Sequence, residues 1–384
     1  MPRIARIETI KVLVPIRPLL VIHSSQGPHS ASPFLLVIVH TEEGETGIGE
    51  ASCTPLWSGE DHHNAALCIE HNIAPELIGR DINDLPQLIN CIERSTQGMP
   101  FTKSAVQMAL WDLLSKLRNE PLWRTLGGSI SAEPKIPIKF SISGASPSRA
   151  AEIAAFALGH GFTTMKVKVG IRSGESGKIW KDDVDRVLAV RGAVGPAVIL
   201  GVDANGGWSA GEAVEAINEL KDAADIGFVE QPVPAQDHAG MRAVRTQTGL
   251  PVIADESLFE PQHASDLIDA RAADIFSVYV GKGGGIQGAL QMCATGQAAG
   301  IRTLLGSNLE LGVGATAMLH TAIAARSHGA TLFESDIIGP LYYETELLET
   351  PISIAKGIAT LPDTGLSGMG IRLNNDAVNT FRVS

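Results

Sequence analysis

The sequence predicts an α/β fold: a (β/α)8-type TIM barrel with an α+β capping domain formed by the N-terminal part and the C-terminal tail. From about residue 136, short strands rich in β-branched residues alternate with Ala-rich helical stretches, in eight units spaced by roughly 25 to 35 residues. Before that point, strands and helices are mixed without such a repeat. An open doubly wound sheet is the alternative, but it rarely needs eight parallel strands, and no GxGxxG motif follows the first strand.

Length, charge and cysteine content limit the classes of function. With 384 residues, 44% of them hydrophobic, the chain can bury a large core. Its formal net charge is −12 without a basic cluster, which argues against nucleic acids and anionic membranes as partners. The four cysteines fall in no CxxC or Cys/His spacing, so the sequence predicts neither a zinc site nor a disulfide framework, and it favours a reducing cytoplasm.

The first region, residues 1–130, is predicted to be the capping domain. Charged residues and prolines interrupt its apolar N-terminal stretch, which therefore predicts a strand over residues 7–14 and neither a signal peptide nor a membrane helix. Residues 34–51 predict a hairpin with a polar turn. Residues 102–117 keep a helical period until Pro121 stops it.

The second region, residues 131–348, is predicted to be the barrel, and residues 349–384 are expected to pack back on the capping domain. The strands are expected at residues 136–143, 163–170, 197–205, 226–232, 251–257, 274–282, 302–308 and 331–336. Barrel active sites are built at the C-terminal ends of the strands. The side chains expected there, in strand order, are Lys166, Lys168, Asp203, Asn205, Glu230, Asp255, Glu256 and Lys282. Residues far apart in sequence should therefore share one pocket.

Three successive strand ends carry a carboxylate, namely Asp203, Glu230 and Asp255, and there is no His or Cys among these rim residues. An all-oxygen set of this kind suits a hard cation such as Mg²⁺ or Mn²⁺. The alternative is that each acid caps the helix that follows its strand, which is a common role for Asp at a βα turn. Three successive strands flanked by lysines favour the metal site.

Lys166 and Lys168 share one face of the second strand, because side chains alternate along a strand. Two ammonium groups side by side near a divalent cation repel, which lowers the pKa of each, and a neutral lysine can take up a proton. The sequence therefore predicts that Lys166 holds Lys168 in a state fit for proton transfer. The alternative is a salt-bridge ladder with the acids of the third strand, which leaves Lys282 without a role.

The rim motifs resemble those of a known family. They are, in strand order, KVK (166–168), DAN (203–205), EQP (230–232), ADES (254–257) and KGGG (282–285). Together they resemble the enolase superfamily, in the muconate lactonizing enzyme (muconate cycloisomerase) subgroup of the mandelate racemase/muconate lactonizing enzyme family. The resemblance covers nearly the whole chain, from GIGEA in the capping region to the closing IGPL. It implies the modified barrel and the capping domain of that superfamily.

The resemblance also implies a role for each rim residue. Mg²⁺, with Mn²⁺ as a substitute, would be bound by Asp203, Glu230 and Asp255. Lys168 would be the acid/base on one face of the substrate, and Lys282 would sit on the other. Lys166 would tune Lys168 and contact the substrate carboxylate.

Three further residues match positions near the substrate, namely Asn205, Glu256 and Glu310. The mandelate racemase branch of the family would use a His and Asp pair on the seventh and sixth strands. This chain has Ser307 and Lys282 there, which excludes that mechanism.

In this family, two loops of the capping domain select the substrate, and the matching segments are residues 21–33 and 52–63. The first is rich in Ser, Gly and Pro, as expected for a mobile lid. Trp57 in the second could close over an apolar or cationic part of the ligand, or pack against the barrel rim. His62 and His63 lie at an expected helix start, so they predict a solvated face and not a metal site.

Three positions near the rim bear on the substrate. Dipeptide epimerases of the family carry two aspartates one residue apart after the eighth strand to bind the substrate ammonium, whereas this chain has Asp336 but Ile338. Gly283, where muconate enzymes often have Asn, weighs against the muconate assignment in turn, as does Tyr279.

These observations predict a Mg²⁺-dependent enzyme that abstracts or returns a proton on the carbon next to a substrate carboxylate, through an enolate intermediate. Muconate-type cycloisomerisation is the first expectation. The second is racemisation or epimerisation of an amino-acid derivative (N-acyl amino acid, dipeptide or proline-like), and the third is dehydration of an acid sugar or hydroxy acid.

Two other classes stay open, a Schiff-base aldolase, which also places a lysine on the sixth strand, and a non-catalytic carboxylate-binding barrel. The expected partner is a small-molecule carboxylate, with no nucleic acid and no membrane. The resemblance implies a homo-oligomer, an octamer or a dimer.

Overall fold

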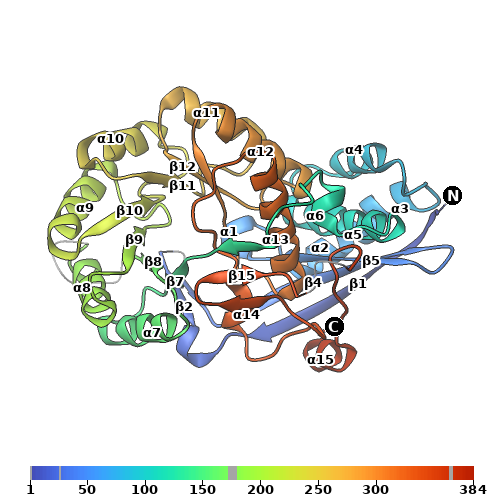
Figure 1. Cartoon of the computed structure of the whole chain (residues 1–384), viewed down its shortest axis with the longest axis horizontal. Helices are drawn as coiled ribbons and strands as arrows, with labels where there is room; N and C mark the ends of the chain where they lie inside the picture. The colour runs from blue at the N-terminus through green and yellow to red at the C-terminus, as the bar shows by residue number, and fades with distance from the viewer. Residues whose placement is uncertain (1, 26, 172–179, 363–365) are drawn as a thin grey trace.

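The computed structural model describes residues 2–25, 27–171, 180–362 and 366–384. Figure 1 shows a curled sheet of parallel strands ringed by helices and, beside it, an antiparallel sheet covered by the helices of the N-terminal part. One large cluster of buried apolar side chains extends through both parts, and a second fills the space between the antiparallel sheet and its helices. Among the described helices, none is long and apolar enough to cross a membrane.

The antiparallel sheet forms the centre of the capping part. It contains β1 (Ile4–Pro15), β4 (Ala31–Thr41) and β5 (Thr46–Ser52), in the order β1-β4-β5. The predicted strand over residues 7–14 and the predicted hairpin are therefore confirmed.

The predicted helix is confirmed as α5 (Pro100–Leu117), which lies against β5. A Cβ atom at Gly49 would come within 1.9 Å of the Ala105 carbonyl oxygen, so only glycine allows the helix to approach this closely. The other capping elements are η1 (Pro18–Leu20), β2 (Ile22–Ser24), β3 (Gly27–His29), α1 (Pro55–Ser58), α2 (His62–Cys68), η2 (Ile69–Ile73), α3 (Ala74–Leu77), α4 (Leu85–Ser95) and α6 (Leu122–Thr125).

Within the described residues, seven parallel strands form the curled sheet, in the order β13-β12-β11-β10-β9-β8-β7. They are β7 (Phe140–Ile142), β8 (Thr164–Lys168), β9 (Ile199–Asp203), β10 (Ile226–Glu230), β11 (Val252–Ala254), β12 (Ile275–Val278) and β13 (Arg302–Leu305). The helices between and after them are α7 (Pro147–Gly159), α8 (Lys181–Val194), α9 (Ala210–Ala224), α10 (His238–Thr248), α11 (Pro261–Ala270), α12 (Ile286–Ala298) and α13 (Gly312–Ser327). The alternation predicted from the sequence is confirmed.

The first and eighth barrel strands differ from the prediction. Residues 331–336 form no regular strand; single parallel bridges join Leu332 to Thr303 on one edge of the sheet and Ser335 to Ile138 near the other. Backbone bonds from this segment alternate between its two neighbours, so the barrel closes without a continuous ladder. The predicted first strand is divided, because its beginning, β6 (Lys135–Pro137), pairs with β15 (Ile358–Thr360).

The C-terminal segment runs along both parts of the molecule. Strands β14 (Ser353–Ala355) and β15 form a hairpin beside β6, after the short helix α14 (Gly339–Tyr342). Helix α15 (Asn375–Phe381) lies next to β1, as Figure 1 shows, and Arg382 forms a bridge with Val12.

A buried carboxylate joins the capping sheet to the barrel. Glu50 of β5, the glutamate of the GIGEA motif, accepts hydrogen bonds from the backbone N–H groups of Leu311 (2.8 Å) and Gly314 (2.9 Å) at the start of α13. These N–H groups have no partner within the helix. The capping part therefore supplies the N-terminal cap of a barrel helix, which fixes the position of one part on the other.

Candidate active site

The register of the parallel sheet brings the predicted rim residues to one edge. Lys168 on β8 is paired with Asp203 on β9, and Asp203 is paired with Glu230 on β10. Asp255 directly follows β11, and Glu256 comes next. Parallel strands end at the same edge, so these side chains share one rim.

The carboxylates at this rim do not cap the following helices, which was the alternative interpretation. The N-cap positions of α9, α10 and α11 are held by Ser209, Asp237 and Glu260. Helix capping therefore does not explain why these three strands end in acids.

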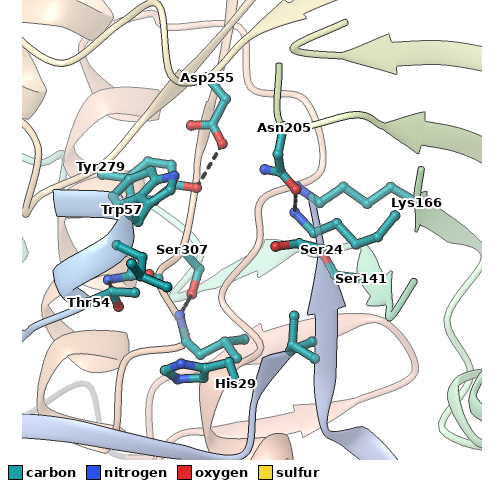
Figure 2. Close-up of a pocket in the computed structure, with 15 residues that line it drawn as sticks. Ser24, His29, Thr54, Trp57, Ser141, Lys166, Asn205, Asp255, Tyr279 and Ser307 are labelled. Carbon is teal, nitrogen blue, oxygen red and sulfur yellow. Dashed lines mark hydrogen bonds between the residues drawn. The ribbon is translucent and has the colours of Figure 1, made fainter. Parts of the chain in front are cut away.

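A pocket of about 850 Å³, including its open mouth, lies at this rim, between the barrel and the capping part. Figure 2 shows Trp57 and Tyr279 on one side of it and Lys166 and Asn205 on the other. Five predicted site residues line the pocket, namely Trp57, Lys166, Lys168, Asn205 and Asp255. The other six lie outside this lining; Glu256 is half-buried, and five are buried, namely Asp203, Glu230, Lys282, Glu310 and Asp336.

Lys166 is surrounded by acids. Its Nζ bonds to Glu230 Oε1 and lies 3.2 Å from Asp203 Oδ2 and 3.3 Å from Asp336 Oδ2. Although burial opposes the charge, these carboxylates raise the pKa of Lys166 well above its ordinary value. The sequence predicted a lowered pKa for Lys166; among these acids the pKa is raised instead, because their negative charges favour the ammonium form more than burial opposes it.

Lys168 is held by two acceptors at the pocket surface. Its Nζ donates to Asp203 Oδ2 at 2.6 Å and to Asn205 Oδ1 at 2.8 Å, and the side chain is 14% exposed. Burial opposes ionisation of Asp203, but Lys168 and Lys166 together hold the pKa of that carboxyl well below its ordinary value. The salt-bridge ladder with the third strand, which was the alternative interpretation, is therefore present, and it fixes the direction in which Lys168 points at the pocket.

The acids at the rim fit a divalent cation by their chemistry. Glu230 is fully buried, yet its Oε2 makes no hydrogen bond; Lys139 Nζ lies 4.0 Å from this oxygen. Burial raises the pKa of Glu230 to about 8 despite the neighbouring lysine ammonium groups. In the described part of the chain, no three His, Cys, Asp or Glu side chains are gathered at metal-binding geometry; the rim acids turn to lysines instead. Glu230 Oε2 is nevertheless a buried carboxylate oxygen without a partner, and its strand lies between the strands whose ends carry Asp203 and Asp255. Together these three carboxylates offer the oxygen ligands that Mg²⁺ prefers.

Lys282 is placed behind the pocket wall. Its side chain is 0% exposed, and its Nζ lies 3.9 Å from the ring centroid of Tyr279. The residue on this side that lines the pocket is Tyr279, whose hydroxyl donates to Asp255 Oδ2 at 3.1 Å. The acid/base role predicted for Lys282 stays a prediction.

Trp57 packs against the barrel rim, which was one of the two interpretations that the sequence left open; its closure over a ligand stays a prediction. It lines the pocket, and its ring packs against the barrel residues Tyr279 (5.3 Å between centroids) and Phe259 (5.1 Å). Its Nε1 donates to Glu256 Oε1 at 3.4 Å, and the same oxygen accepts from Asn205 Nδ2 at 2.9 Å. Glu256 thus connects the two sides of the pocket.

The loop that carries Trp57 is fixed by a carboxylate that the sequence analysis did not single out. Glu60 is buried and accepts bonds from the backbone N–H groups of Phe101 (3.0 Å) and Thr102 (2.8 Å), at the start of α5. His62 and His63 follow in the first turn of α2; His63 is exposed and His62 half-buried. Their predicted solvated face is confirmed for His63.

Asp336 and Lys139 form a buried pair beneath Lys166. Lys139 is fully buried, and its Nζ donates to Asp336 Oδ2 at 2.7 Å. Lys139 was not among the predicted site residues. Its signal was alternation, since Lys139, Ser141 and Ser143 occupy one face of a segment whose other face is apolar. Because Asp336 is engaged by two lysines and does not line the pocket, it is not presented to a substrate ammonium.

Glu310 shapes the pocket through its neighbours. Its carboxylate accepts from Ser307 Oγ (2.5 Å) and from the backbone N–H of Asn308 (3.0 Å), and both of these residues line the pocket. Asn308 Nδ2 in turn donates to the Ser52 carbonyl at 2.9 Å. Glu310 therefore holds the end of the seventh strand against the capping part.

The capping segments add neutral groups to the lining. From residues 21–33, of which residue 26 lies outside the described residues, Ile22, Ser24 and His29 line the pocket. Burial lowers the pKa of His29, so its imidazole is neutral, and its Nε2 bonds to Ser32 Oγ at 2.6 Å. The predicted lid segment is the hairpin β2–β3.

Comparison with known proteins agrees with this architecture. Residues 5–127 match the model of the mandelate racemase / muconate lactonizing enzyme N-terminal domain, and residues 148–377 match the enolase C-terminal domain-like model. The chain is 33% identical to the L-Ala-D/L-Glu epimerase of Bacillus subtilis, over 96% of each chain. A substrate-liganded structure of that epimerase superposes with a TM-score of 0.88, at 32% identity over 96% of this chain and 98% of the other.

Two other relatives represent the range of reactions. Muconate cycloisomerase 1 of Rhodococcus opacus is 30% identical over 92% of this chain and 91% of its own. The dipeptide epimerase of Enterococcus faecalis V583, solved with Mg and the dipeptide L-Leu-L-Tyr, has a TM-score of 0.87 at 27% identity, over 96% of this chain and 99% of the other.

These relatives are isomerases that match this chain over nearly its whole length, and the resemblance seen in its rim motifs is thereby confirmed. The chain is an isomerase of the mandelate racemase/muconate lactonizing enzyme family in the enolase superfamily.

Proposed function

We propose that this enzyme requires Mg²⁺ and transfers a proton to or from the carbon next to the carboxylate of a small substrate. The observation that carries the proposal is the position of Lys168, which reaches the pocket surface while Asp203 and Asn205 fix its Nζ. A positioned amine within reach of a bound carbon acid is what general acid/base catalysis needs. The solved dipeptide epimerase with Mg supports the choice of cation.

Asp203, Glu230 and Asp255 are the residues that would hold the cation. When bound, it would offset the negative charge that builds on the substrate carboxylate as the proton leaves. Lys166 keeps its proton among the acids and lines the pocket, so it can donate a hydrogen bond to the same carboxylate. Lys168 takes the proton from the neighbouring carbon or returns it there, and Asn205 orients its amine.

For the specific reaction we propose a muconate-type cycloisomerisation. Among the described residues that line the pocket, Asp255 alone is acidic, and the capping side offers Ile22, His29 and Leu56. No acid there would neutralise a substrate ammonium, and Asp336 is engaged by lysines. A substrate whose second polar group is neutral or anionic suits this lining better than a dipeptide with a free ammonium.

Racemisation of an N-acylated amino acid is the second candidate. It uses the same proton abstraction, and such a substrate has no free ammonium. The identity of 33% to an L-Ala-D/L-Glu epimerase favours this candidate, and the neutral capping side accommodates it equally well.

The experiment that tests the proposal is proton NMR in D₂O with Mg²⁺. cis,cis-Muconate is offered beside panels of N-acyl amino acids, dipeptides, proline derivatives and hydroxy acids. We expect deuterium to enter one carbon next to a carboxylate, and the product distinguishes a lactone from an epimer or an alkene. EDTA and the Lys168→Ala substitution should abolish exchange, whereas Lys135→Ala, at an exposed lysine of β6, should leave it unchanged. Exchange that persists in Lys168→Ala would contradict the proposal.

A further inference from the structure

A short series of hydrogen bonds runs from the capping side of the pocket to the C-terminal segment. His29 Nε2 lies 2.6 Å from Ser32 Oγ, and Ser32 Oγ lies 2.8 Å from the hydroxyl of Tyr343. The Tyr343 hydroxyl lies 2.7 Å from the carbonyl oxygen of Leu309. His29 and Leu309 line the pocket, whereas Ser32 and Tyr343 are buried outside its lining. These four groups are called the His29 relay below, and Figure 2 shows His29 at the end of the pocket away from Asp255.

Only one direction of proton donation satisfies the His29 relay. A carbonyl oxygen can only accept, so the single hydroxyl proton of Tyr343 goes to Leu309. Burial raises the pKa of Tyr343 well above its ordinary value, so the phenol keeps this proton. The Tyr343 oxygen must then accept from Ser32. Because Ser32 has given away its one hydroxyl proton, its Oγ must accept from His29.

The relay therefore fixes the tautomer of His29, with the proton on Nε2. Burial lowers the pKa of the ring, so the imidazole is neutral and its Nδ1 keeps a lone pair. The opposite tautomer would leave the oxygens of Ser32 and Tyr343 at 2.8 Å with no proton between them. Within the described residues, no side chain or backbone group bonds to Nδ1. It is thus the polar atom of His29 that is left for a ligand.

Both ends of the relay are held in place. The Tyr343 ring packs edge-on against Phe34 of β4, with centroids 5.7 Å apart, and the Tyr343 backbone forms a bridge with Ile16. Leu309 has a φ of 57°, in the left-handed region, and its N–H donates to Ser307 Oγ at 2.9 Å. A ligand therefore cannot reverse the relay without disturbing buried groups of both the capping part and the barrel.

From this geometry we propose that Tyr343, which does not line the pocket, selects the substrate through His29. Tyr343 and Ser32 are positioning residues that hold His29 as an acceptor, and His29 Nδ1 accepts a hydrogen bond from an N–H or O–H group of the substrate. The inference rests on the proposed function and narrows it to a carboxylate that also carries an amide or hydroxyl donor. Unsubstituted cis,cis-muconate has no such donor, so N-acylated amino acids and hydroxylated acids rank above it.

The selection follows from the cost of an unpaired acceptor. A substrate that offers an ester or carboxylate oxygen to Nδ1 sets two acceptors against each other, and the relay prevents His29 from turning its proton toward the ligand. A site built to pair with a donor discriminates against an analogue that lacks it. One neutral hydrogen bond of this kind corresponds to about a tenfold preference.

The first test needs no substrate. The imidazole nitrogen signals are read by NMR in enzyme that contains isotope-labelled histidine, and those of His29 are identified by their loss in His29→Ala. We expect a neutral ring with the proton on Nε2. Tyr343→Phe frees the Ser32 proton to turn toward His29, so the tautomer with the proton on Nδ1 should appear. Tyr342→Phe is the matched control, since the Tyr342 hydroxyl donates to the Ser141 carbonyl and lies outside the relay.

A second variant breaks the relay at another point. Ser32→Ala removes the acceptor of Nε2, so the Nδ1 tautomer should appear as in Tyr343→Phe, and thermal unfolding shows which of the two variants folds. A native ring with its proton on Nδ1 would overturn the inference. The same holds if the folded variants keep the tautomer of the unmodified enzyme.

The second test compares matched substrates in the D₂O exchange assay with Mg²⁺. Each N-acetyl amino acid is paired with the O-acetyl 2-hydroxy acid of the same side chain, and each hydroxy acid with its methyl ether. For the pair whose donor reaches His29, we expect kcat/KM to favour the donor by about tenfold more in the unmodified enzyme than in Tyr343→Phe. Intrinsic differences in acidity within a pair cancel in this comparison, and a general loss of activity would not change the ratio. Lys135→Ala should keep it.

Two outcomes of the second test would refute the selection. One is the same ratio in Tyr343→Phe as in the unmodified enzyme, for every pair that is turned over. The other is turnover of cis,cis-muconate with a higher kcat/KM than any donor-bearing compound. Absence of turnover with every compound would instead count against the proposed function, and the tautomer of His29 in the unmodified enzyme and in Tyr343→Phe would then decide the inference.

Discussion

The two halves of the pocket are built from unlike groups. The barrel half presents Lys166, Lys168 and Asp255, which are ion-paired with further buried charges. The capping half presents neutral groups such as His29 and Leu56, and Leu56 is 80% exposed. The difference indicates that the barrel fixes the chemical step, since charges in a buried network have little freedom to move, and that the capping part selects the substrate.

The largest loss of activity is expected when the barrel half of the pocket loses its proton-transfer group. Lys168→Ala is expected to lower kcat by about 10³-fold with KM nearly unchanged, because the amine acts on the reacting carbon and contributes less to binding. Steady-state kinetics on the substrate found by NMR measures both constants. Lys135→Ala serves as the control, and an equal loss in that variant would mean that the effect is not local to the pocket.

Thermal unfolding with and without Mg²⁺ tests whether the rim acids bind the cation together. Mg²⁺ at about 100 times its Kd should stabilise the folded enzyme by about 2.7 kcal/mol, because it binds the folded state alone. Glu230→Gln removes a charge from the donor set and should abolish this gain, which thermal unfolding with and without Mg²⁺ would show. Glu133→Gln, at an exposed glutamate, should keep the gain in full. A gain that survives Glu230→Gln would mean that Mg²⁺ binds elsewhere.

Substitutions in the capping half of the pocket should weaken substrate binding and leave the turnover rate nearly unchanged. Leu56→Ala removes apolar surface from the pocket lining, so KM is expected to rise by up to about tenfold with kcat nearly unchanged. Ile130→Ala is a matched control, since Ile130 is 77% exposed and lies outside the lining. A loss confined to kcat in Leu56→Ala would contradict the division of labour between the two halves.

The smallest expected effect concerns the junction between the two parts. His320 of α13 is fully buried; its Nδ1 accepts from the backbone N–H of Trp123, and burial lowers its pKa to about 4. Because the unfolded chain binds this proton and the folded chain does not, stability is complete above the unfolded pKa and is lost as pH falls from about 6.5 toward 4. Between about pH 7 and about pH 5.5, the loss from His320 should be about 1 kcal/mol.

Urea unfolding at both pH values measures this loss. His320→Asn retains an acceptor without a titratable group, so its free energy of unfolding should fall less on acidification than that of the unmodified enzyme. An equal fall in both proteins would assign the pH dependence to other groups.

Much of this architecture follows from the sequence by itself. The alternation of strands and helices predicted the barrel, and the acids at the ends of β9, β10 and β11 predicted a shared rim, because parallel strands place their ends at one edge. The hairpin over residues 34–51 and the helix α5 were likewise predicted from period and turn chemistry. These features depend on local periodicity, which is written in the order of the residues.

The tertiary structure alone decided which side chain faces the pocket on the sixth strand. Strand β12 ends at Val278, so Tyr279 is the first residue beyond it, whereas Lys282 lies in a turn whose direction no periodicity encodes. The same holds for Lys166, whose charge depends on acids from four other strand ends, and for the eighth strand, which closes the barrel by single bridges. Side-chain direction in turns, and the balance of charges brought together from distant segments, arise only when the whole chain has folded.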